Sequence, residues 1–384
     1  MTIMGKKELT SATKPRYLKA DKKEKGKILD EFCRNTNYAR KYAVKILAAG
    51  YDNNRVAKIG RKRRVRVYGS GIISVVIKIW ELLNFPCGAR LAPSLPEMYE
   101  VLARFKEIAF NENIQAKLRT ISAKTIDRRL KRDRAIRHLK RNRGMTSGGS
   151  LLKSSIPVRI TDWDTGKLGF MEIDTVAHNG GDPSGIFVFT LDLTEIFSGW
   201  AEQKAVMGKG ETGVLNAAKD IRKDLPFDLL GIDGDNGGEI INYQMLKYCV
   251  DEKLVYTRSR PDRKNDNAYI EQKNKTHVRE LVGYGRYDTP EQLCLLNDLY
   301  RKEYRLFTNF FRPVMKIKSK EKINNSVCRK KYDIAKSPYQ RLMACDQTTK
   351  EAKDKLTALY LSLNPIQLKR TIDLKVAKIR ATTK

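Results

Sequence analysis

The sequence has 384 residues but only three histidines, and its six cysteines stand far apart without a C-x-x-C pair. Zinc sites built from cysteine and histidine need closely spaced ligand pairs, so their absence excludes a zinc module. No apolar run approaches the roughly 20 residues that cross a bilayer, and residues 1–8 lack the apolar stretch of a signal peptide. We therefore expect a protein that is neither membrane-bound nor secreted, with reduced, buried thiols, in which oxygen atoms hold any bound metal.

What the sequence has in excess is positive charge, with 76 Lys and Arg against 44 Asp and Glu and a formal net charge of +32. A charge of this size repels itself unless a polyanion is near, and nucleic acid is the usual one. The charge is uneven, at +23 over residues 1–150, −6 over 151–300 and +15 over 301–384. Solvated surface charge, as in ribosomal or chromatin proteins, is one explanation. The alternative is a catalytic carboxylate domain that basic neighbours deliver to DNA.

Two segments of the basic N-terminal region have the spacing of helix-turn-helix pairs. In the first, apolar residues recur at helical spacing over 27–33 and 38–47, on either side of a turn at 34–36. Arg40 and Lys41 would then face outward, where such a pair contacts DNA. Many helical hairpins that bind no DNA share this pattern, so both interpretations stay open.

The second segment is the better helix-turn-helix candidate. One helix ends near Leu118, a turn follows at 120–121, and Ser122 caps a helix over 123–130. The side chains expected to face DNA phosphates are Lys124, Arg128 and Arg129.

Composition divides the chain into five regions. A basic run adds candidate DNA contacts at Arg61, Arg63 and Arg64. A proline-rich stretch over 84–96 predicts a loop, and the Gly/Ser-rich run at 146–150 predicts a linker. The expected regions are a first helix-turn-helix over 1–60, a second over 61–145, a linker over 146–165, an α/β core over 166–305, and a basic DNA-binding or assembly region over 306–384. In the last region we expect helices at 350–363 and 365–379.

The central region changes to a pattern of strands. Three extended runs predict antiparallel strands, at 168–178, 185–194 and 198–207. Helices and strands then alternate, with helices at 211–224, 239–252 and 265–282 and strands at 227–233 and 254–257. This order predicts a ribonuclease-H-like α/β domain, a mixed five-stranded sheet with flanking helices. Both faces of the second strand look apolar near its middle, which indicates a sheet covered on two sides.

Three carboxylates stand out by their location. Asp174 lies mid-strand, where a charge is costly without a partner or a metal. Asp235 follows the short strand that ends at Asp233, and Glu271 lies on the long predicted helix. Taken singly, each could be an ordinary surface acid.

Taken together, the three carboxylates match a known constellation. Residues 165–312 carry an Asp-Thr pair at Asp174, an Asp-Asn-Gly turn at Asp235, and Asn-Asp-Asn-Ala-x-x-Glu ending at Glu271. There are 60 residues between the first two acids and 35 between the second and third. This set resembles the DDE transposases and integrases of the retroviral-integrase type, most closely those of bacterial insertion sequences. The N-terminal zinc domain of retroviral integrases is absent, and the helix-turn-helix pairs stand in its place.

The resemblance implies a transposase that binds the terminal inverted repeats of its element, cleaves their 3′ ends and joins them to target DNA. It implies Asp174, Asp235 and Glu271 as ligands of two Mg²⁺ ions, for which Mn²⁺ would substitute, and a homodimer or higher oligomer in the complex that pairs the ends. Physics alone leaves Glu172, Asp233 and Asp266 open as rivals, and the family pattern selects the trio. We would place such an enzyme in the bacterial cytoplasm, with the nucleoid.

The helix that carries Glu271 has a second candidate function. Asn267, Glu271, Lys275 and Arg279 recur every four residues and would share one helix face. This face either forms stabilising Glu–Lys pairs or places Lys275 and Arg279 on DNA phosphates beside the metals. We expect Asp192 to be structural, and His178 and His277 are weaker candidates for chemistry.

Two other functions compete with the transposase. A catalytically silent, transposase-derived regulator would bind DNA without needing the intact trio. A ribonuclease-H-like nuclease without strand transfer would not need the basic flanking regions.

Overall fold

The computed structural model describes residues 1–48, 67–137, 166–234, 237–259, 268–322 and 328–383. The chain forms two compact units, Met1–Val67 and Tyr68–Lys384. The predicted contacts Arg61, Arg63 and Arg64 and the linker at 146–165 lie outside the described residues.

The first unit contains three described helices, α1 (Ile3–Lys19), α2 (Lys22–Thr36) and α3 (Arg40–Ala48). The two helices predicted from the apolar spacing are present, and α1 adds a third. The turn begins at Asn37 rather than at residue 34, because the Thr36 hydroxyl bonds back to the Phe32 carbonyl and Asn37 adopts a left-handed φ of 58°. Apolar side chains from all three helices form the core, among them Tyr17, Ile28, Phe32, Ala43 and Leu47.

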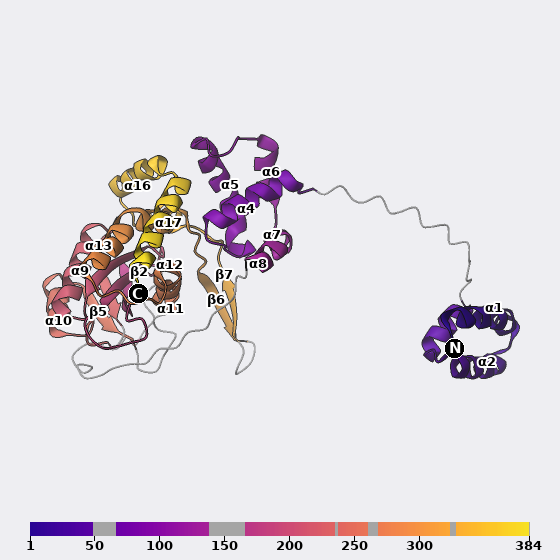
Figure 1. Ribbon diagram of the computed structural model, residues 1–384. Coiled ribbons are helices and arrows are strands. Elements are labelled where there is room, and N and C mark those ends of the chain that lie inside the picture. The colour runs from indigo at the N-terminus through magenta and orange to yellow at the C-terminus, as the bar shows by residue number, and fades with distance from the viewer. Residues whose placement is uncertain (49–66, 138–165, 235–236, 260–267, 323–327, 384) are drawn as a thin grey trace. The chain divides into compact units, whose positions relative to one another are not determined.

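The second unit begins with a helical region that contains the second predicted pair (Figure 1). Its helices are α4 (Ser70–Leu82), α5 (Gly88–Arg104), α6 (Glu112–Thr120), α7 (Ala123–Arg129) and α8 (Lys131–Ile136). The Ser122 hydroxyl accepts a hydrogen bond from the Thr125 amide at 3.2 Å, which is the predicted cap of α7. Ile126 and Leu130 are fully buried and fix α7 against the rest of this region.

The prediction of a loop over 84–96 is wrong, because α5 begins at Gly88 and continues through Pro93 and Pro96. Each proline removes one helical hydrogen bond, but Leu91 and Leu95 on the same helix are fully buried. The start of α5 also has a partner outside the helix, since the Gly88 amide donates to the Asp127 carboxylate at 2.8 Å. Packing therefore outweighs the local preference of the prolines.

A mixed five-stranded sheet lies at the centre of the second unit. Its strands are β1 (Phe170–Ala177), β2 (Val188–Glu195), β3 (Ala201–Met207), β4 (Gly231–Gly234) and β5 (Val255–Arg258), in the order β3-β2-β1-β4-β5. β1, β2 and β3 are antiparallel neighbours, whereas β4 runs parallel to both β1 and β5. The sheet with flanking helices that the sequence predicts is confirmed.

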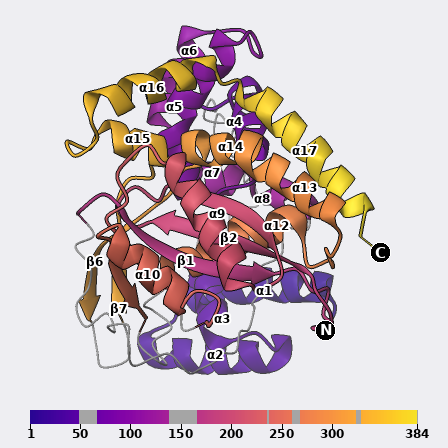
Figure 2. The same ribbon diagram turned by 90° about the vertical axis from the view of Figure 1, so that its left-hand side faces the viewer.

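The two faces of the sheet differ in character. Helices α9 (Glu211–Lys223) and α10 (Tyr243–Asp251) cover an apolar face that includes Ile173, Leu191 and Ile232, and Figure 2 shows them in front of the sheet. The opposite face is covered by α11 (Ala268–Lys273), the π-helical segments η1 (Asn274–Arg279) and η2 (Tyr300–Tyr304), α13 (Pro290–Leu299) and α14 (Arg305–Phe311). The short helix α12 (Glu280–Val282) directly follows η1.

The second face carries several polar side chains, although apolar residues had been expected on both faces of β2. Every residue of β2 is buried, so coverage on two sides is confirmed. The side chains that point toward these helical segments include Glu172 and Asp174 of β1 and Thr190 and Asp192 of β2. Buried polar groups need partners, and this face is where a polar site can be built.

Two asparagines pair with the backbone of β3, which is an edge strand. The side-chain amide of Asn309 donates to the Ala201 carbonyl and accepts from the Ala201 amide, both at 2.9 Å. Asn297 makes the same pair with Ala205, at 3.0 and 2.8 Å. Side chains of α13 and α14 thus take the place of a sixth strand at these two positions.

The C-terminal residues pack onto the same unit. They form the hairpin β6 (Ile317–Lys322) and β7 (Cys328–Tyr332) and the helices α15 (Pro338–Met343), α16 (Lys350–Ser362) and α17 (Pro365–Ala381). The two predicted C-terminal helices are confirmed. Phe310 stacks on Tyr339 with ring centroids 5.0 Å apart, and Tyr339 stacks on Tyr360 at 4.6 Å.

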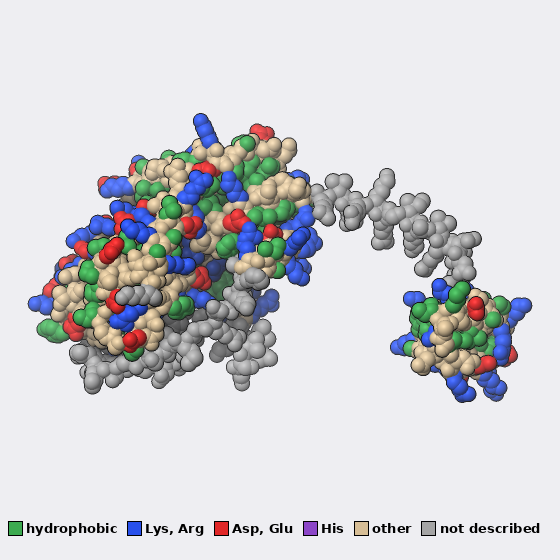
Figure 3. Space-filling view, in the orientation of Figure 1, with side chains coloured by type: hydrophobic (Ala, Val, Ile, Leu, Met, Phe, Trp, Pro, Cys, Tyr) green, Lys and Arg blue, Asp and Glu red, His purple; other side chains and the backbone are tan. Residues whose placement is uncertain are grey.

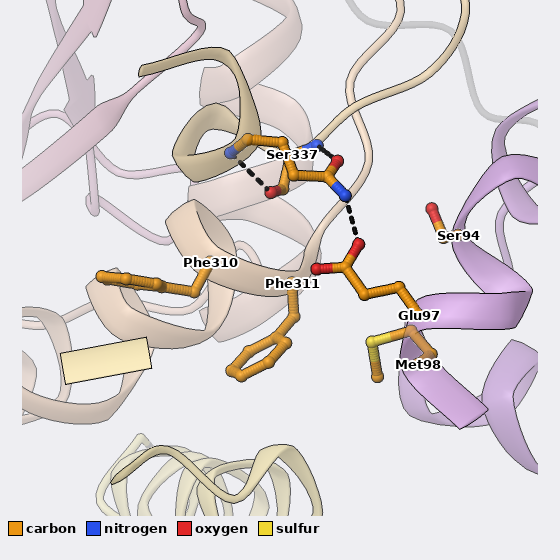
Figure 4. A pocket seen from close by; sticks show the side chains of 7 residues that line it. Ser94, Glu97, Met98, Phe310, Phe311 and Ser337 are labelled. Atoms are coloured by element: carbon orange, nitrogen blue, oxygen red, sulfur yellow. Dashed lines mark hydrogen bonds between the residues drawn. The ribbon is translucent and has the colours of Figure 1, made fainter. Parts of the chain in front are cut away.

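A small pocket marks where α5 meets the C-terminal residues (Figure 4). Glu97 of α5 accepts hydrogen bonds from the Gln340 amide and, at 2.6 Å, from the Tyr360 hydroxyl. The helical region is therefore joined to the core by polar as well as apolar contacts.

Cys87 and Cys294 are exposed, so the expectation that the thiols are buried is wrong for these two. No helix among the described residues has the length and apolar character needed to span a membrane.

Candidate active site

Asp174 is the best-defined member of the predicted trio. It lies in the middle of β1, half-buried, and its side chain points to the polar face beneath η1. One carboxylate oxygen accepts from the Thr175 amide at 2.7 Å, and the other accepts from the Asn274 side-chain amide at 2.5 Å. These two donors fix the direction of the carboxylate.

The strand that leads into Asp235 lies beside Asp174. β1 and β4 are parallel neighbours, and their last described pair is Ile173 with Gly234, the residues that directly precede the two predicted carboxylates. Asp235 itself lies outside the described residues.

The helix that contains Glu271 is fixed to β1 by a hydrogen bond. The Ile270 amide in α11 donates to the Glu172 carboxylate at 2.9 Å. Ile270 is fully buried, and α11 contacts both β1 and β2. The side chain of Glu271 lies outside the described part of the chain, but its backbone belongs to a helix held against the strand that carries Asp174.

Two of the three rival carboxylates have structural roles. Glu172 is 1% exposed and holds α11, and Asp233 is fully buried and accepts from the Thr257 hydroxyl at 2.5 Å. The third rival, Asp266, lies outside the described residues. Asp174 is more exposed than either Glu172 or Asp233, which favours it as a metal or substrate ligand. Within the described ranges no three Asp, Glu, His or Cys side chains form a metal-binding group. Asp235 and the side chain of Glu271 lie outside those ranges.

The four-residue periodicity expected after Glu271 does not continue along the helix. From Asn274 to Arg279 the backbone is π-helical, with hydrogen bonds to the fifth residue along, so residues four apart no longer share a face. Lys275 is exposed, whereas Arg279 is half-buried with its guanidinium 5.0 Å from the Tyr284 ring centroid. Burial lowers the pKa of Arg279. The roles of Lys275 and Arg279 as DNA contacts stay predictions.

Asn274 and a buried polar cluster below it escaped the sequence analysis. In this cluster the Gln203 amide donates to the Asp192 carboxylate at 3.0 Å, and the Lys273 ammonium donates to the Gly199 carbonyl at 3.1 Å. Asp192 pairs directly with Asp174 across β1 and β2. Burial raises the pKa of Asp192 to about 7 and lowers that of Lys273 to about 7. The sequence offered one indication that Lys273 and Asn274 belong to the site, namely that they follow Glu271 by two and three residues.

Both described histidines of this face are buried and neutral. The His178 ring lies 2.8 Å from the Thr190 hydroxyl and packs edge-on against Tyr287. The His277 ring lies 3.3 Å from the Lys273 ammonium. Burial lowers the pKa of His277 and lowers that of His178 to about 3. Neither ring is placed to exchange protons with a substrate in water.

The buried His178 predicts a pH dependence of stability. Between pH 6.5 and about 3 the unfolded chain binds a proton at this residue and the folded chain does not, so acid destabilises the fold. The free energy of unfolding should fall by up to about 1.4 kcal/mol per pH unit in this window, and His178→Gln should reduce the slope. Urea unfolding at a series of pH values measures both slopes. Above pH 7 the curves of unfolding free energy against pH should be parallel for wild type and His178→Gln. Parallel curves between pH 4 and 6 would contradict a lowered pKa of His178 in the folded protein.

The predicted DNA contacts on the helical pairs have different environments. Lys124 and Arg128 are exposed, whereas Arg129 donates to the Tyr68 carbonyl and is half-buried. Lys and Arg side chains gather over α7 and α8 (Figure 3). On α3 of the first unit, Lys41 is exposed and Arg40 pairs with Asp30.

Comparison with known proteins shows the family of the chain. It is 36% identical over 333 residues to Uncharacterized protein y4rM of Sinorhizobium fredii, a match that covers 86% of this chain and 93% of the relative. The chain belongs to the y4rM family. No protein-family model matches it.

Solved structures give weaker likenesses than the y4rM relative does. The catalytic core domain of BIV integrase is 15% identical, with a TM-score of 0.25, and the match covers 30% of this chain and 70% of that one. A simian T-cell lymphotropic virus intasome in complex with PP2A regulatory subunit B56 gamma is 13% identical, with a TM-score of 0.27, covering 48% and 59%. Scores this low carry no argument, so the fold assignment rests on strand order and direction.

Proposed function

We propose that this protein is the transposase of an insertion sequence, which cleaves the 3′ ends of its element and joins them to target DNA. The observation that carries the proposal is the setting of Asp174. It is a half-buried carboxylate on the polar face of the sheet, next to the strand that leads into Asp235. Its hydrogen-bond donor Asn274 belongs to η1, the segment that directly follows the helix containing Glu271. The spacing of the three acids in the sequence supports the same assignment.

The reaction would consist of two in-line displacements at phosphorus. Water first attacks the phosphodiester at the element end and releases a 3′-hydroxyl, and that hydroxyl then attacks a target phosphate and displaces the target's 3′ oxygen. Each step breaks one phosphorus–oxygen bond and forms another, so no covalent protein intermediate is needed. The role of the protein is to hold the reacting groups in line and to offset the charge that develops.

The residues of the site suit hard oxygen-binding cations. Asp174 offers oxygen acceptors alone, which is the ligand type that Mg²⁺ and Mn²⁺ prefer. With Asp235 and Glu271 it would hold two ions, which would stabilise both the attacking and the leaving oxygen. The chain's own residues prepare this site, because the Asn274 amide and the Thr175 amide orient the Asp174 carboxylate before any ligand binds.

The test is metal-dependent cleavage and joining by the purified full chain. The substrate is a plasmid that carries the DNA flanking the gene, incubated with Mg²⁺, Mn²⁺ or EDTA beside a Glu271→Gln control. Joined products that need both metal and Glu271 support the transposase. Cleavage without joining would instead indicate the nuclease, and binding without chemistry under any metal would indicate the regulator.

Arg128 is expected to contact the element ends through the second helical pair. Arg128 is exposed on α7, so Arg128→Ala should weaken binding to end DNA by roughly tenfold, the cost of one charged contact. Arg129 is a poorer probe because it bonds to the Tyr68 carbonyl. Fluorescence anisotropy with labelled end DNA measures the change, and the exposed Lys219 of α9, changed to Ala, is the charge-matched control. Equal affinities for Arg128→Ala and wild type would discredit this pair as a DNA-binding element.

A further inference from the structure

We infer that the hairpin β6-β7 is an arm that contacts duplex DNA. Its two strands, Ile317–Lys322 and Cys328–Tyr332, contain six basic residues and one acidic residue, a net charge of +5. This inference rests on the proposed function in one respect, namely that DNA is the substrate. It narrows the basic region 306–384, expected from the sequence to bind DNA or to take part in assembly, to this hairpin.

The outer part of the hairpin is exposed on both of its faces. Successive side chains of a strand point to opposite faces, and on β7 the neighbours Arg329, Lys330 and Lys331 are all exposed. On β6 Lys318 is exposed as well. Glu321 pairs with Lys331 across the two strands, so the single acid is already matched.

The base of the hairpin is held firmly, in contrast to its outer part. Asp333 accepts from the Lys316 amide and from the Arg341 guanidinium, both at 2.7 Å, and Arg341 also donates to the Val314 carbonyl at 2.9 Å. The Lys316 ammonium donates to the carbonyls of Ile196 and Phe197, in the turn between β2 and β3. A two-stranded hairpin is marginally stable in water by itself, and these contacts fix its direction on the core.

The shape and charge of the hairpin fit one occupant, duplex DNA. The major groove of B-DNA is wide enough to admit a two-stranded β-ribbon. Five residues of strand at roughly 3.3 Å each span about 17 Å, or about five base pairs at 3.4 Å. Basic side chains on both faces of such a ribbon would meet the phosphates on both sides of the groove. The surface of a protein partner, whether acidic or apolar, would contact only one face of the ribbon and leave the basic side chains of the other face without a partner.

The test is the salt dependence of DNA binding by the full chain. The variant Lys318→Gln, Arg329→Gln, Lys330→Gln leaves the Glu321–Lys331 pair intact. Each lost phosphate contact lowers the slope of log affinity against log salt by about 0.9, so the slope should fall by about 2 to 3. The control carries Lys219→Gln, Lys247→Gln and Lys253→Gln, three exposed lysines on or beside α9 and α10. With the same change in net charge, it should keep the wild-type slope.

The outcomes separate this inference from the proposed function. Binding is measured in EDTA, so it needs no chemistry, and cleavage is assayed separately. An unchanged slope in the hairpin variant, or an equal fall in the control, overturns the inference even if the protein cleaves and joins DNA. A hairpin-dependent slope without any cleavage supports the arm and counts against the transposase. Loss of self-association with unchanged DNA affinity would assign the hairpin to a second copy of the chain and overturn the inference.

Three further variants keep the test valid if the triple variant does not fold. The single changes Lys318→Gln and Lys330→Gln should each lower the slope by about 0.9. The variant Lys318→Arg, Lys330→Arg keeps the charge and should restore the wild-type slope. Failure of both expectations overturns the arm.

Discussion

Asp174→Asn is expected to abolish cleavage and joining while leaving the affinity for end DNA within about twofold of wild type. The amide keeps the size of the side chain but removes the charge and replaces one oxygen with a nitrogen, which hard cations bind poorly. We expect the rate of cleavage to fall by about 10³-fold or more, on the order of the loss when one key electrostatic group is removed. Asp235→Asn and Glu271→Gln should have the same effect. Gel analysis of plasmid products measures cleavage and joining, and anisotropy measures binding.

The control for this result is Asp251→Asn, which makes the same change in an exposed residue at the end of α10. It lies on a helix that covers the apolar face of the sheet and should keep full activity. Full activity in Asp235→Asn would contradict the assignment of Asp235 to the active site. Loss of DNA binding in Asp174→Asn would indicate a folding defect.

Arg305→Ala is expected to lower the free energy of unfolding by about 3 to 5 kcal/mol, the usual cost of breaking a buried ion pair from one side. The Arg305 guanidinium donates to the Glu202 carboxylate at 2.8 and 3.2 Å, and the side chains are 18% and 6% exposed. Burial already raises the pKa of Glu202, and Arg305 opposes that shift. Without the arginine, the carboxylate stays buried with the Trp200 indole as a donor at 2.8 Å. Urea unfolding of the full chain measures the loss.

Arg301 provides the matched control for this stability test. It lies one turn earlier, its side chain is 76% exposed, and it pairs with Asp224 at 3.5 Å. Exposed pairs of this kind contribute about 0 to 1 kcal/mol. Arg301→Ala should therefore change stability much less than Arg305→Ala. Equal effects would show that burial does not set the strength of the Arg305–Glu202 pair.

The arrangement of the sheet could be predicted because period-2 and helical patterns alternate clearly between 168 and 282. The polar face could not be predicted in the same way. Thr190 and Asp192 alternate with Phe189 and Leu191 in β2, and the pattern alone did not show that one face would collect polar side chains from all five strands. Their partners come from segments far away in the sequence, as Asn274 does for Asp174.

Local rules failed where tertiary packing opposed them. Pro93 and Pro96 predicted a loop, yet the burial of Leu91 and Leu95 keeps α5 helical. The spacing of Glu271, Lys275 and Arg279 predicted one helix face, yet the backbone becomes π-helical at Asn274. A one-residue change in hydrogen-bond register leaves no mark in the pattern of residue types. The trio itself was found through resemblance, and its geometry beyond Asp174 stays a prediction.

The two asparagines of α13 and α14 that pair with β3 have a consequence for aggregation. An edge strand with open amides and carbonyls is a template onto which a strand of another molecule can add. In this protein the groups of Ala201 and Ala205 are occupied by Asn309 and Asn297, so an incoming strand would have to displace both side chains. A fragment that ends at residue 305 would keep Asn297 and lose Asn309. Helices α13 and α14 thus protect the sheet from pairing with other molecules, and a chain that lacks α14 would expose part of that edge.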